Sequence, residues 1–335
     1  MTKKIPLNNL RISNDLVIEQ INRAIHKVIT SGNYLFGKET KKFSVEWSKY
    51  CGQKFCIPCK NGTDALSLAA KALNIKKAIV QANTIPLTAQ GLYLGGAKIT
   101  ISDVNTDGRS NIISKNLVPV LLYGRQPTKD ELKSKIFDAA HAHGWKPPKH
   151  AVACWSFYPT KILGGMGDSG AVTTNDPLIA KKIAELSGSR DILNNPKQIN
   201  SRIDEIQASI LRIKLKFLDE YIFERRKIAS LYQENLINTV RIVSSVNNDF
   251  HHLLVIYAPH NRDKLKRYLL ERGIETKVHY PIPLNKIKST WFNKKQLENA
   301  NIWSEHILSL PMFIGIKKST IITISKAINN FYKNN

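Results

Sequence analysis

Segments typical of strands alternate with segments typical of helices over the first two thirds of the chain, and this alternation restricts the fold more than any other feature. Apolar residues recur at helical spacing over residues 16–29, and an Ala- and Leu-rich helix is predicted over residues 63–73. Short apolar runs of strand length follow at residues 78–80, 98–101, 118–122, 135–137 and 151–154. The pattern predicts an α/β fold with a mainly parallel sheet, in which ligands bind at the carboxyl ends of the strands.

The last third of the chain continues the alternation on a smaller scale. A long helical region is predicted over residues 201–236, because Ile203, Ile206 and Ile210 share one face. Beyond residue 247 the sequence predicts strands at 252–257 and 277–280 and helices at 262–271 and 319–332. A chain of 335 residues is long enough for about two domains. We therefore predict a large domain over residues 1–238 and a smaller C-terminal α/β domain over residues 239–335.

The chain is strongly basic, with 50 Lys and Arg residues against 26 Asp and Glu and a net charge of +24. Such a charge can attract nucleic acid or an anionic surface. Here the lysines are scattered along the whole sequence and no Arg-rich tail is present. We therefore expect no nucleic-acid partner, and we interpret the charge as a solvated surface that also suits phosphate-bearing small molecules.

The apolar runs are far shorter than the roughly 20 residues that a membrane-spanning helix needs. The first residues also lack the apolar stretch of a secretory signal. The sequence predicts a cytoplasmic protein without a membrane partner.

Four cysteines occur, and the Cys56-Ile57-Pro58-Cys59 spacing is compatible with a zinc or redox pair. No second such pair and no paired histidines lie at zinc-finger spacing. The flanking residues are typical of a buried strand that enters a turn, so we expect buried structural cysteines and no metal.

Three segments carry residues suited to chemistry, and the first is Asn61-Gly62-Thr63-Asp64-Ala65-Leu66. It follows a strand and opens a helix, whose first N–H groups have no partner within the helix. Together with the Thr63 hydroxyl they can bind a phosphate, and Gly62 allows close approach of the backbone. The alternative is an ordinary helix cap.

The second segment is Phe137-Asp138-Ala139-Ala140-His141-Ala142-His143-Gly144. Asp138 follows an apolar strand, where a carboxylate can hold a buried cationic nitrogen or simply cap a helix. His141 and His143 are two residues apart and so are expected to point in different directions. We therefore predict no metal site at this segment.

The third segment runs from Ser156-Phe157-Tyr158-Pro159-Thr160-Lys161 to Gly170. Lys161 stands alone between an apolar strand and a glycine-rich turn. Burial would lower the pKa of its amine and make it a nucleophile, whereas a lone lysine is ordinarily a solvated surface residue. Ser156 can add a contact to a phosphate.

Taken in order, the three segments resemble the DegT/DnrJ/StrS family of PLP-dependent sugar-nucleotide aminotransferases, and the resemblance covers nearly the whole chain. It implies an aspartate-aminotransferase-like fold, fold type I of the enzymes that use pyridoxal 5'-phosphate (PLP). Lys161 would form the Schiff base with the cofactor, and Asp138 would keep the pyridine nitrogen protonated. Gly62, Thr63 and Ser156 would hold the cofactor phosphate.

The resemblance also assigns roles outside the three segments. Asn200 would reach the cofactor phosphate from a neighbouring subunit, which implies a homodimer with shared active sites. His279 and Tyr280 would border the sugar pocket, although both can equally be an ordinary strand end. Two positions depart from the family pattern: His141 stands where Gln is usual, near the cofactor O3', and Ile85 replaces a ring that stacks on the cofactor.

The implied reaction is transfer of an amino group, with glutamate as the expected donor, to a keto sugar of a nucleoside-diphosphate sugar. The motif with Gly167-Asp168 resembles that of members that aminate C3 of a 3-keto-6-deoxyhexose. Amination at C4 of a 4-keto-6-deoxy sugar is the alternative. A non-catalytic regulator that binds PLP or a sugar nucleotide is an alternative of another class.

Overall fold

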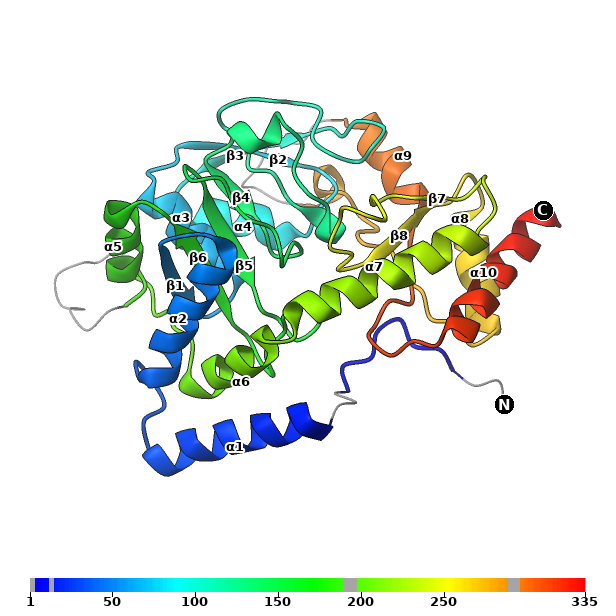
Figure 1. Cartoon of the computed structure of the whole chain (residues 1–335). Coiled ribbons are helices and arrows are strands. Elements are labelled where there is room, and N and C mark those ends of the chain that lie inside the picture. Colours follow the sequence, from blue (N-terminus) through cyan, green and yellow to red (C-terminus); the bar gives the residue numbers. More distant parts are fainter. Residues whose placement is uncertain (1–3, 12–14, 189–197, 289–295, 335) are drawn as a thin grey trace.

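The computed structural model describes residues 4–11, 15–188, 198–288 and 296–334. A mixed sheet lies at the centre of its N-terminal part, with helices on both sides (Figure 1). Its strand order is β1–β6–β5–β4, formed by Phe55–Cys59, Gly170–Thr174, Val152–Ser156 and Ile136–Asp138. Strands β4 and β5 are parallel, whereas β6 is antiparallel to both β5 and β1.

Strands β2 (Lys77–Gln81) and β3 (Lys98–Ser102) form a separate parallel pair. The segment 117–120 connects this pair to the central sheet, because Leu117 forms a parallel bridge with Ile79 of β2 and Val120 forms one with Asp138 of β4. The prediction of a regular strand over 118–122 is therefore wrong, because Pro119 has no N–H to donate and the chain turns into a 3₁₀ helix at Leu122–Gly124. The parallel direction predicted for most of the sheet is confirmed.

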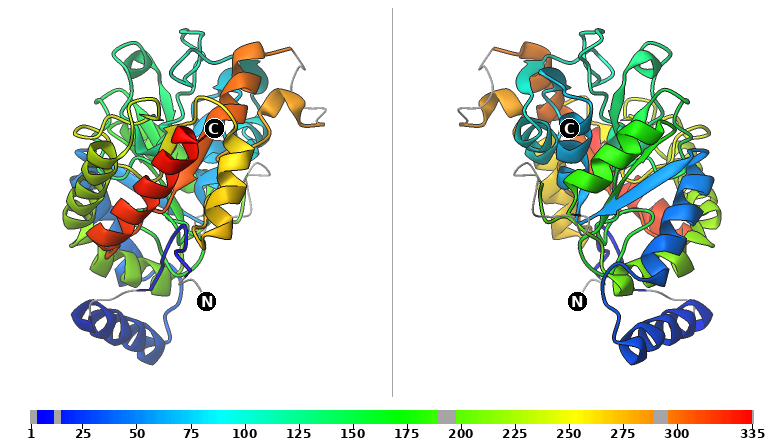
Figure 2. Two further views of the ribbon diagram at one scale, coloured as in Figure 1. Left: turned by 90° about the vertical axis from the view of Figure 1, so that its right-hand side faces the viewer. Right: turned by 90° about the vertical axis from the view of Figure 1, so that its left-hand side faces the viewer.

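Helix α3 (Gly62–Ala72) packs against four strands of the central sheet, namely β1, β4, β5 and β6. Its residues from Ala65 to Ala70 are all buried, as their Ala- and Leu-rich sequence predicts. The same part of the chain holds α2 (Lys38–Cys51), α4 (Pro86–Leu94) and α5 (Pro177–Leu186). Figure 2 gives two further views, in which the helices lie on the outside of the strands.

The helical region predicted over 201–236 consists of two helices, α6 (Glu205–Leu215) and α7 (Leu218–Asn235). The two helices are joined by a short turn at which the chain bends, and in this turn Lys216 and Phe217 donate to carbonyls three residues earlier (Figure 1). Acidic residues in the first turn of α7 and basic residues in the last turn of α6 suit the two helix dipoles that meet there. Helix α1 (Asp15–Ser31) packs against α6 through a small separate core of Val17, Ile21 and Ile210.

The C-terminal part has an antiparallel sheet of β7 (Arg241–Ile242), β8 (Leu254–Tyr257) and β9 (Ile307–Leu310). The strand predicted over 277–280 is a single bridge between Lys277 and Ser309. Pro281 and Pro283 follow it directly and have no N–H to continue a strand. The helices here are α8 (Arg262–Glu271), α9 (Glu298–His306) and α10 (Lys318–Lys333).

The two parts of the chain share contacts and one extended hydrophobic core. Figure 1 shows α7 running from one part to the other, where it packs against α10. Ile5 pairs with Ile274, so the first described residues lie on the C-terminal part. A domain boundary at residue 238 stays a prediction.

Within the described residues, no helix combines the length and the apolar character needed to cross a bilayer. All four cysteines are free thiols, and the strand predicted at Cys56–Cys59 is β1. Burial raises the pKa of each thiol.

Candidate active site

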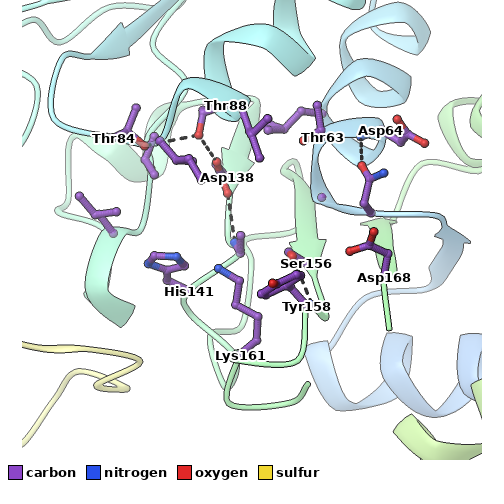
Figure 3. Close-up of a pocket in the computed structure, with 18 of the residues that line it drawn as sticks. Thr63, Asp64, Thr84, Thr88, Asp138, His141, Ser156, Tyr158, Lys161 and Asp168 are labelled. Atoms are coloured by element: carbon purple, nitrogen blue, oxygen red, sulfur yellow. Dashed lines mark hydrogen bonds between the residues drawn. The ribbon is translucent and has the colours of Figure 1, made fainter. Parts of the chain in front are cut away.

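A cavity of about 660 Å³ opens where β4 and β5 end and where helices α3 and α4 begin. This is the carboxyl edge of the sheet, the position that the parallel strands predict. Eight of the residues selected from the sequence line it: Gly62, Thr63, Ile85, Asp138, His141, Ser156, Lys161 and Tyr280. Figure 3 shows the polar side chains around this cavity.

Asp138 is the last residue of β4 and is only 6% exposed. Its Oδ2 accepts a hydrogen bond from the Thr88 hydroxyl at 2.7 Å, and its Oδ1 accepts one from the Ala140 N–H at 3.1 Å. Burial raises the pKa of Asp138, whereas the bonds from Thr88 and Ala140 and the charge of Lys161 oppose that rise. The carboxylate is thus desolvated and held in one orientation, which suits the binding of a buried cation.

Lys161 enters the cavity from the turn after β5, opposite Asp138 (Figure 3). The turn is closed by backbone hydrogen bonds, from Lys161 N–H to the Tyr158 carbonyl at 2.8 Å and from Gly165 N–H to the Phe157 carbonyl at 2.7 Å. Burial lowers the pKa of the Lys161 amine to about 8, although the Asp138 charge acts in the opposite direction. An appreciable fraction of the amine is therefore unprotonated near neutral pH, as a nucleophile requires.

The start of α3 forms the far end of the cavity. Asn61 caps the helix, because its side chain accepts from the Asp64 N–H at 2.8 Å. The N–H groups of Gly62 and Thr63 precede Ala65, the first residue that donates within the helix, and so have no helical acceptor. A Cβ on Gly62 would lie 2.8 Å from the Ser156 Cβ, so a glycine is needed for these two segments to meet. Backbone N–H groups and two hydroxyls thus converge in the arrangement expected for a phosphate.

His141 lines the cavity, and its Nδ1 accepts from the Tyr123 N–H at 3.2 Å. Burial lowers the pKa of His141 well below the ordinary value, so the ring is neutral and carries its proton on Nε2. His143 instead stacks on Phe157 and accepts from the Leu163 N–H at 3.2 Å. The prediction that the two histidines point in different directions is confirmed. In the described ranges, no three His, Cys, Asp or Glu side chains are grouped so as to hold a metal ion.

The remaining predicted residues lie in two different settings. Tyr280 lines the cavity, whereas His279 lies beside it and bonds to the Ser309 hydroxyl at 2.7 Å. The His279 carbonyl accepts from the Tyr123 hydroxyl at 2.6 Å, which fixes the segment that carries Tyr280. Asn200 is exposed on this chain and does not line the cavity, so its role across a subunit interface stays a prediction.

Sequence reasoning missed Thr84, Thr88 and Tyr158, which also line the cavity. The two threonines flank Pro86 at the start of α4, and a proline at the first helical position is a recognisable start signal. That signal places their hydroxyls at a helix N-terminus, but only the tertiary structure shows that Asp138 is nearby.

These residues fit PLP. A lysine amine, a buried carboxylate opposite it and a phosphate cradle are the groups that bind the aldehyde, the ring nitrogen and the phosphate of that cofactor. The carboxylate has no ion-pair partner within 4.0 Å in the part of the chain described here, which leaves it available to a cationic ring. Fold and site together define the class of fold type I enzymes that act through a lysine-bound cofactor.

The chain belongs to the DegT/DnrJ/EryC1/StrS aminotransferase family. The sequence pattern of that family matches residues 16–117 and 130–329. The chain is 33% identical to dTDP-3-amino-3,6-dideoxy-alpha-D-galactopyranose transaminase of Aneurinibacillus thermoaerophilus, over 98% of this chain and 99% of that protein. It is 32% identical to UDP-2-acetamido-2-deoxy-3-oxo-D-glucuronate aminotransferase of Pseudomonas aeruginosa, over 93% and 96%.

A solved structure is similar over the same length. The structure of S. venezuelae DesV in complex with a ketimine intermediate superimposes with a TM-score of 0.90 at 29% identity. The match covers 98% of this chain and 99% of that one. The expected fold and the expected family are thus both confirmed.

Proposed function

We propose that the protein is a PLP-dependent aminotransferase that moves an amino group from glutamate to C3 of a keto sugar attached to a nucleoside diphosphate. The observation that carries the proposal is the convergence of Lys161, Asp138 and the start of α3 on one cavity. The cofactor and its chemistry depend on that convergence, and the sugar-nucleotide substrate is supported by the similarity to sugar aminotransferases.

Each group would have one task when the cofactor is bound. PLP would supply an electron-withdrawing ring and an aldehyde carbon that can carry the amino group between the donor and the keto sugar. The Lys161 amine anchors the cofactor and, once released, moves a proton to or from the carbon that exchanges nitrogen. Asp138 keeps the ring nitrogen protonated, and the amides of Gly62 and Thr63 bind the phosphate. His141 offers its Nε2–H as a fixed donor on the same wall.

Two observations support C3 as the site of amination. The relatives described above carry a 3-amino or 3-oxo position in their names, and the motif around Gly167-Asp168 resembles that of members acting at C3. Amination at C4 is the competing outcome, which product analysis separates from C3.

A homodimer is part of the proposal. Three consecutive large side chains, Tyr34, Leu35 and Phe36, are 49%, 42% and 37% exposed, and contiguous exposed apolar surface is typical of an interface. Asn200 is exposed as well, as a residue that serves a neighbouring site must be. We place the protein in the cytoplasm, where its sugar-nucleotide and amino-acid substrates would be available.

The test begins with the purified protein and PLP. We expect visible absorbance, and peptide mapping after borohydride treatment should find the pyridoxyl group on Lys161. Incubation with glutamate and a panel of 3-keto and 4-keto sugar nucleotides, followed by mass spectrometry and NMR of the product, identifies the aminated carbon. Light scattering gives the oligomeric state.

Variants separate catalysis from binding alone. Lys161→Ala and Asp138→Asn should abolish turnover, whereas Lys227→Ala, which changes an exposed lysine on α7, should not. PLP binding without turnover on any keto sugar would favour the alternative function, a non-catalytic regulator that binds PLP or a sugar nucleotide. Full activity in Lys161→Ala would refute the proposed function.

A further inference from the structure

Asp138 is held by a chain of two hydroxyls that the catalytic assignment does not use. The Thr88 Oγ1 lies 2.7 Å from Asp138 Oδ2 and 3.4 Å from the Thr84 Oγ1 (Figure 3). Thr88 is 1% exposed and Thr84 is fully buried, so both contacts are shielded from bulk solvent. Both threonines also line the cavity.

The direction of the hydrogen bonds follows from chemistry. An ionised carboxylate only accepts, so Thr88 must donate its single proton to Asp138. The Thr88 oxygen is then free to accept, and the Thr84 hydroxyl becomes the donor to it. Bonds aligned in one direction polarise and strengthen each other. Thr88 also lies in the first turn of α4, where the helix dipole favours a negative charge nearby.

We propose that Thr88, oriented by Thr84, is a positioning residue that keeps the Asp138 carboxylate ionised and in the rotamer that pairs with a cofactor ring nitrogen. The inference rests on the proposed function, because it needs a cationic ring in the cavity. Asp138 uses one oxygen for Thr88 and the other for the Ala140 N–H. Loss of the Thr88 bond would leave Oδ2 without its donor, so the carboxylate would be less firmly held about its Cβ–Cγ bond and its protonated form would be favoured.

The titratable groups that face Asp138 are few. Lys161 and Tyr280 lie across the cavity, Cys154 lies beside it on β5, and His141 is on the same wall. Burial raises the pKa values of Tyr280 and Cys154 and lowers that of His141. All three groups are the same in every Thr88 variant, so if the low-pH side of the binding profile moves in Thr88→Val but not in Thr88→Ser, the change reports on Asp138.

Binding of pyridoxamine 5'-phosphate tests the inference. This probe has the ring and phosphate of the cofactor but no aldehyde, so no covalent link to Lys161 contributes. Its dissociation constant is measured by calorimetry from pH 5 to 8 for the wild type, Thr88→Val and Thr88→Ser. A hydrogen bond to a charged group is worth about 1 to 2 pH units. The pH below which binding weakens, the acid limb of the profile of dissociation constant against pH, should therefore move up by about that amount in Thr88→Val. In Thr88→Ser it should coincide with that of the wild type.

Two further variants keep the outcome decisive. Thr84→Val leaves the Thr88 bond in place but removes its orienting donor, so it should move the limb in the same direction by less; if Thr88→Val does not fold, this variant decides. Thr323→Val, the same change on the exposed side of α10, should have no effect. Coincident profiles for the wild type and Thr88→Val, or for Thr84→Val in its place, overturn the inference. A wild type that binds no probe at all contradicts the proposed function instead.

Discussion

The reactivity of Lys161 toward PLP should depend on pH in a way that an exposed lysine cannot match. Burial lowers the pKa of this amine from the ordinary 10.5 to about 8. Only the unprotonated amine attacks an aldehyde, so the rate of cofactor attachment should rise with pH and level off near 8. An exposed lysine should continue to gain reactivity for another two pH units or more.

The magnitude follows from the difference between the two pKa values. Each pKa unit changes the ratio of neutral to charged amine tenfold. At pH 7 roughly one tenth of the Lys161 amines would be neutral, a fraction about 300-fold larger than for an ordinary lysine. Asp138 raises the pKa of Lys161, so Asp138→Asn should move the midpoint below 8.

The assay mixes the protein freed of cofactor with PLP at pH 6 to 10, stops each reaction with borohydride, and maps the labelled peptide. Lys214 is the matched control, because burial also lowers its pKa to about 8 but it lies outside the cavity. Formaldehyde with cyanoborohydride should label both lysines early, whereas PLP should label Lys161 alone. A midpoint near 10 for Lys161, or preferential PLP labelling of Lys214, would refute the reasoning.

Three further predictions concern affinity and stability. Ile85→Phe would place a ring beside the cofactor and should tighten PLP binding roughly two- to tenfold; unchanged or weaker binding by titration would show that Ile85 does not lie against the ring. His143 has a pKa of about 3 in the folded protein against 6.5 unfolded, so the unfolded chain binds a proton that the folded protein does not, and stability falls as the pH drops below 6.5. Between pH 7 and 5 this residue should cost about 2 kcal/mol in urea unfolding, and His143→Asn, which keeps an acceptor for Leu163, should lose less; an equal loss in both proteins counts against the assignment. Glu205, 2% exposed, accepts from the N–H groups of Gly37, Glu39 and Thr40 at the start of α2. Glu205→Gln should lower the free energy of unfolding by about 1–3 kcal/mol, while Glu19→Gln on the exposed face of α1 should leave it within error.

Much of the fold could be predicted because local pattern and tertiary role agree. The helix expected over 262–271 is α8 with the same bounds, and the strands β2 to β5 lie where apolar runs predict them. Strand β6 was not predicted, because all five of its residues are buried and its sequence has no alternation to reveal a strand. The break between α6 and α7 was missed since no proline or glycine marks it.

The candidate site likewise contains residues that the sequence could indicate and contacts that only the tertiary structure reveals. Gly62, Asp138 and Lys161 could be selected because each follows or precedes a regular element at a recognisable position, and the carboxyl edge of the sheet brings them together. The bond from Thr88 to Asp138 joins residues 50 apart in the sequence, so no local pattern could indicate it. The role proposed for Asn200 requires a second chain, and no pattern within one chain indicates which residues a neighbouring subunit would contribute.

Helix α3 presents the cradle at one end while the rest of its length is sealed inside the core. A coenzyme seated on its first turn would therefore fasten the central element of the whole N-terminal layer rather than a peripheral loop. A ligand that binds only the native form lowers the fraction of unfolded molecules. The concentration of free PLP would therefore set the resistance of the protein to heat and proteolysis as well as its activity.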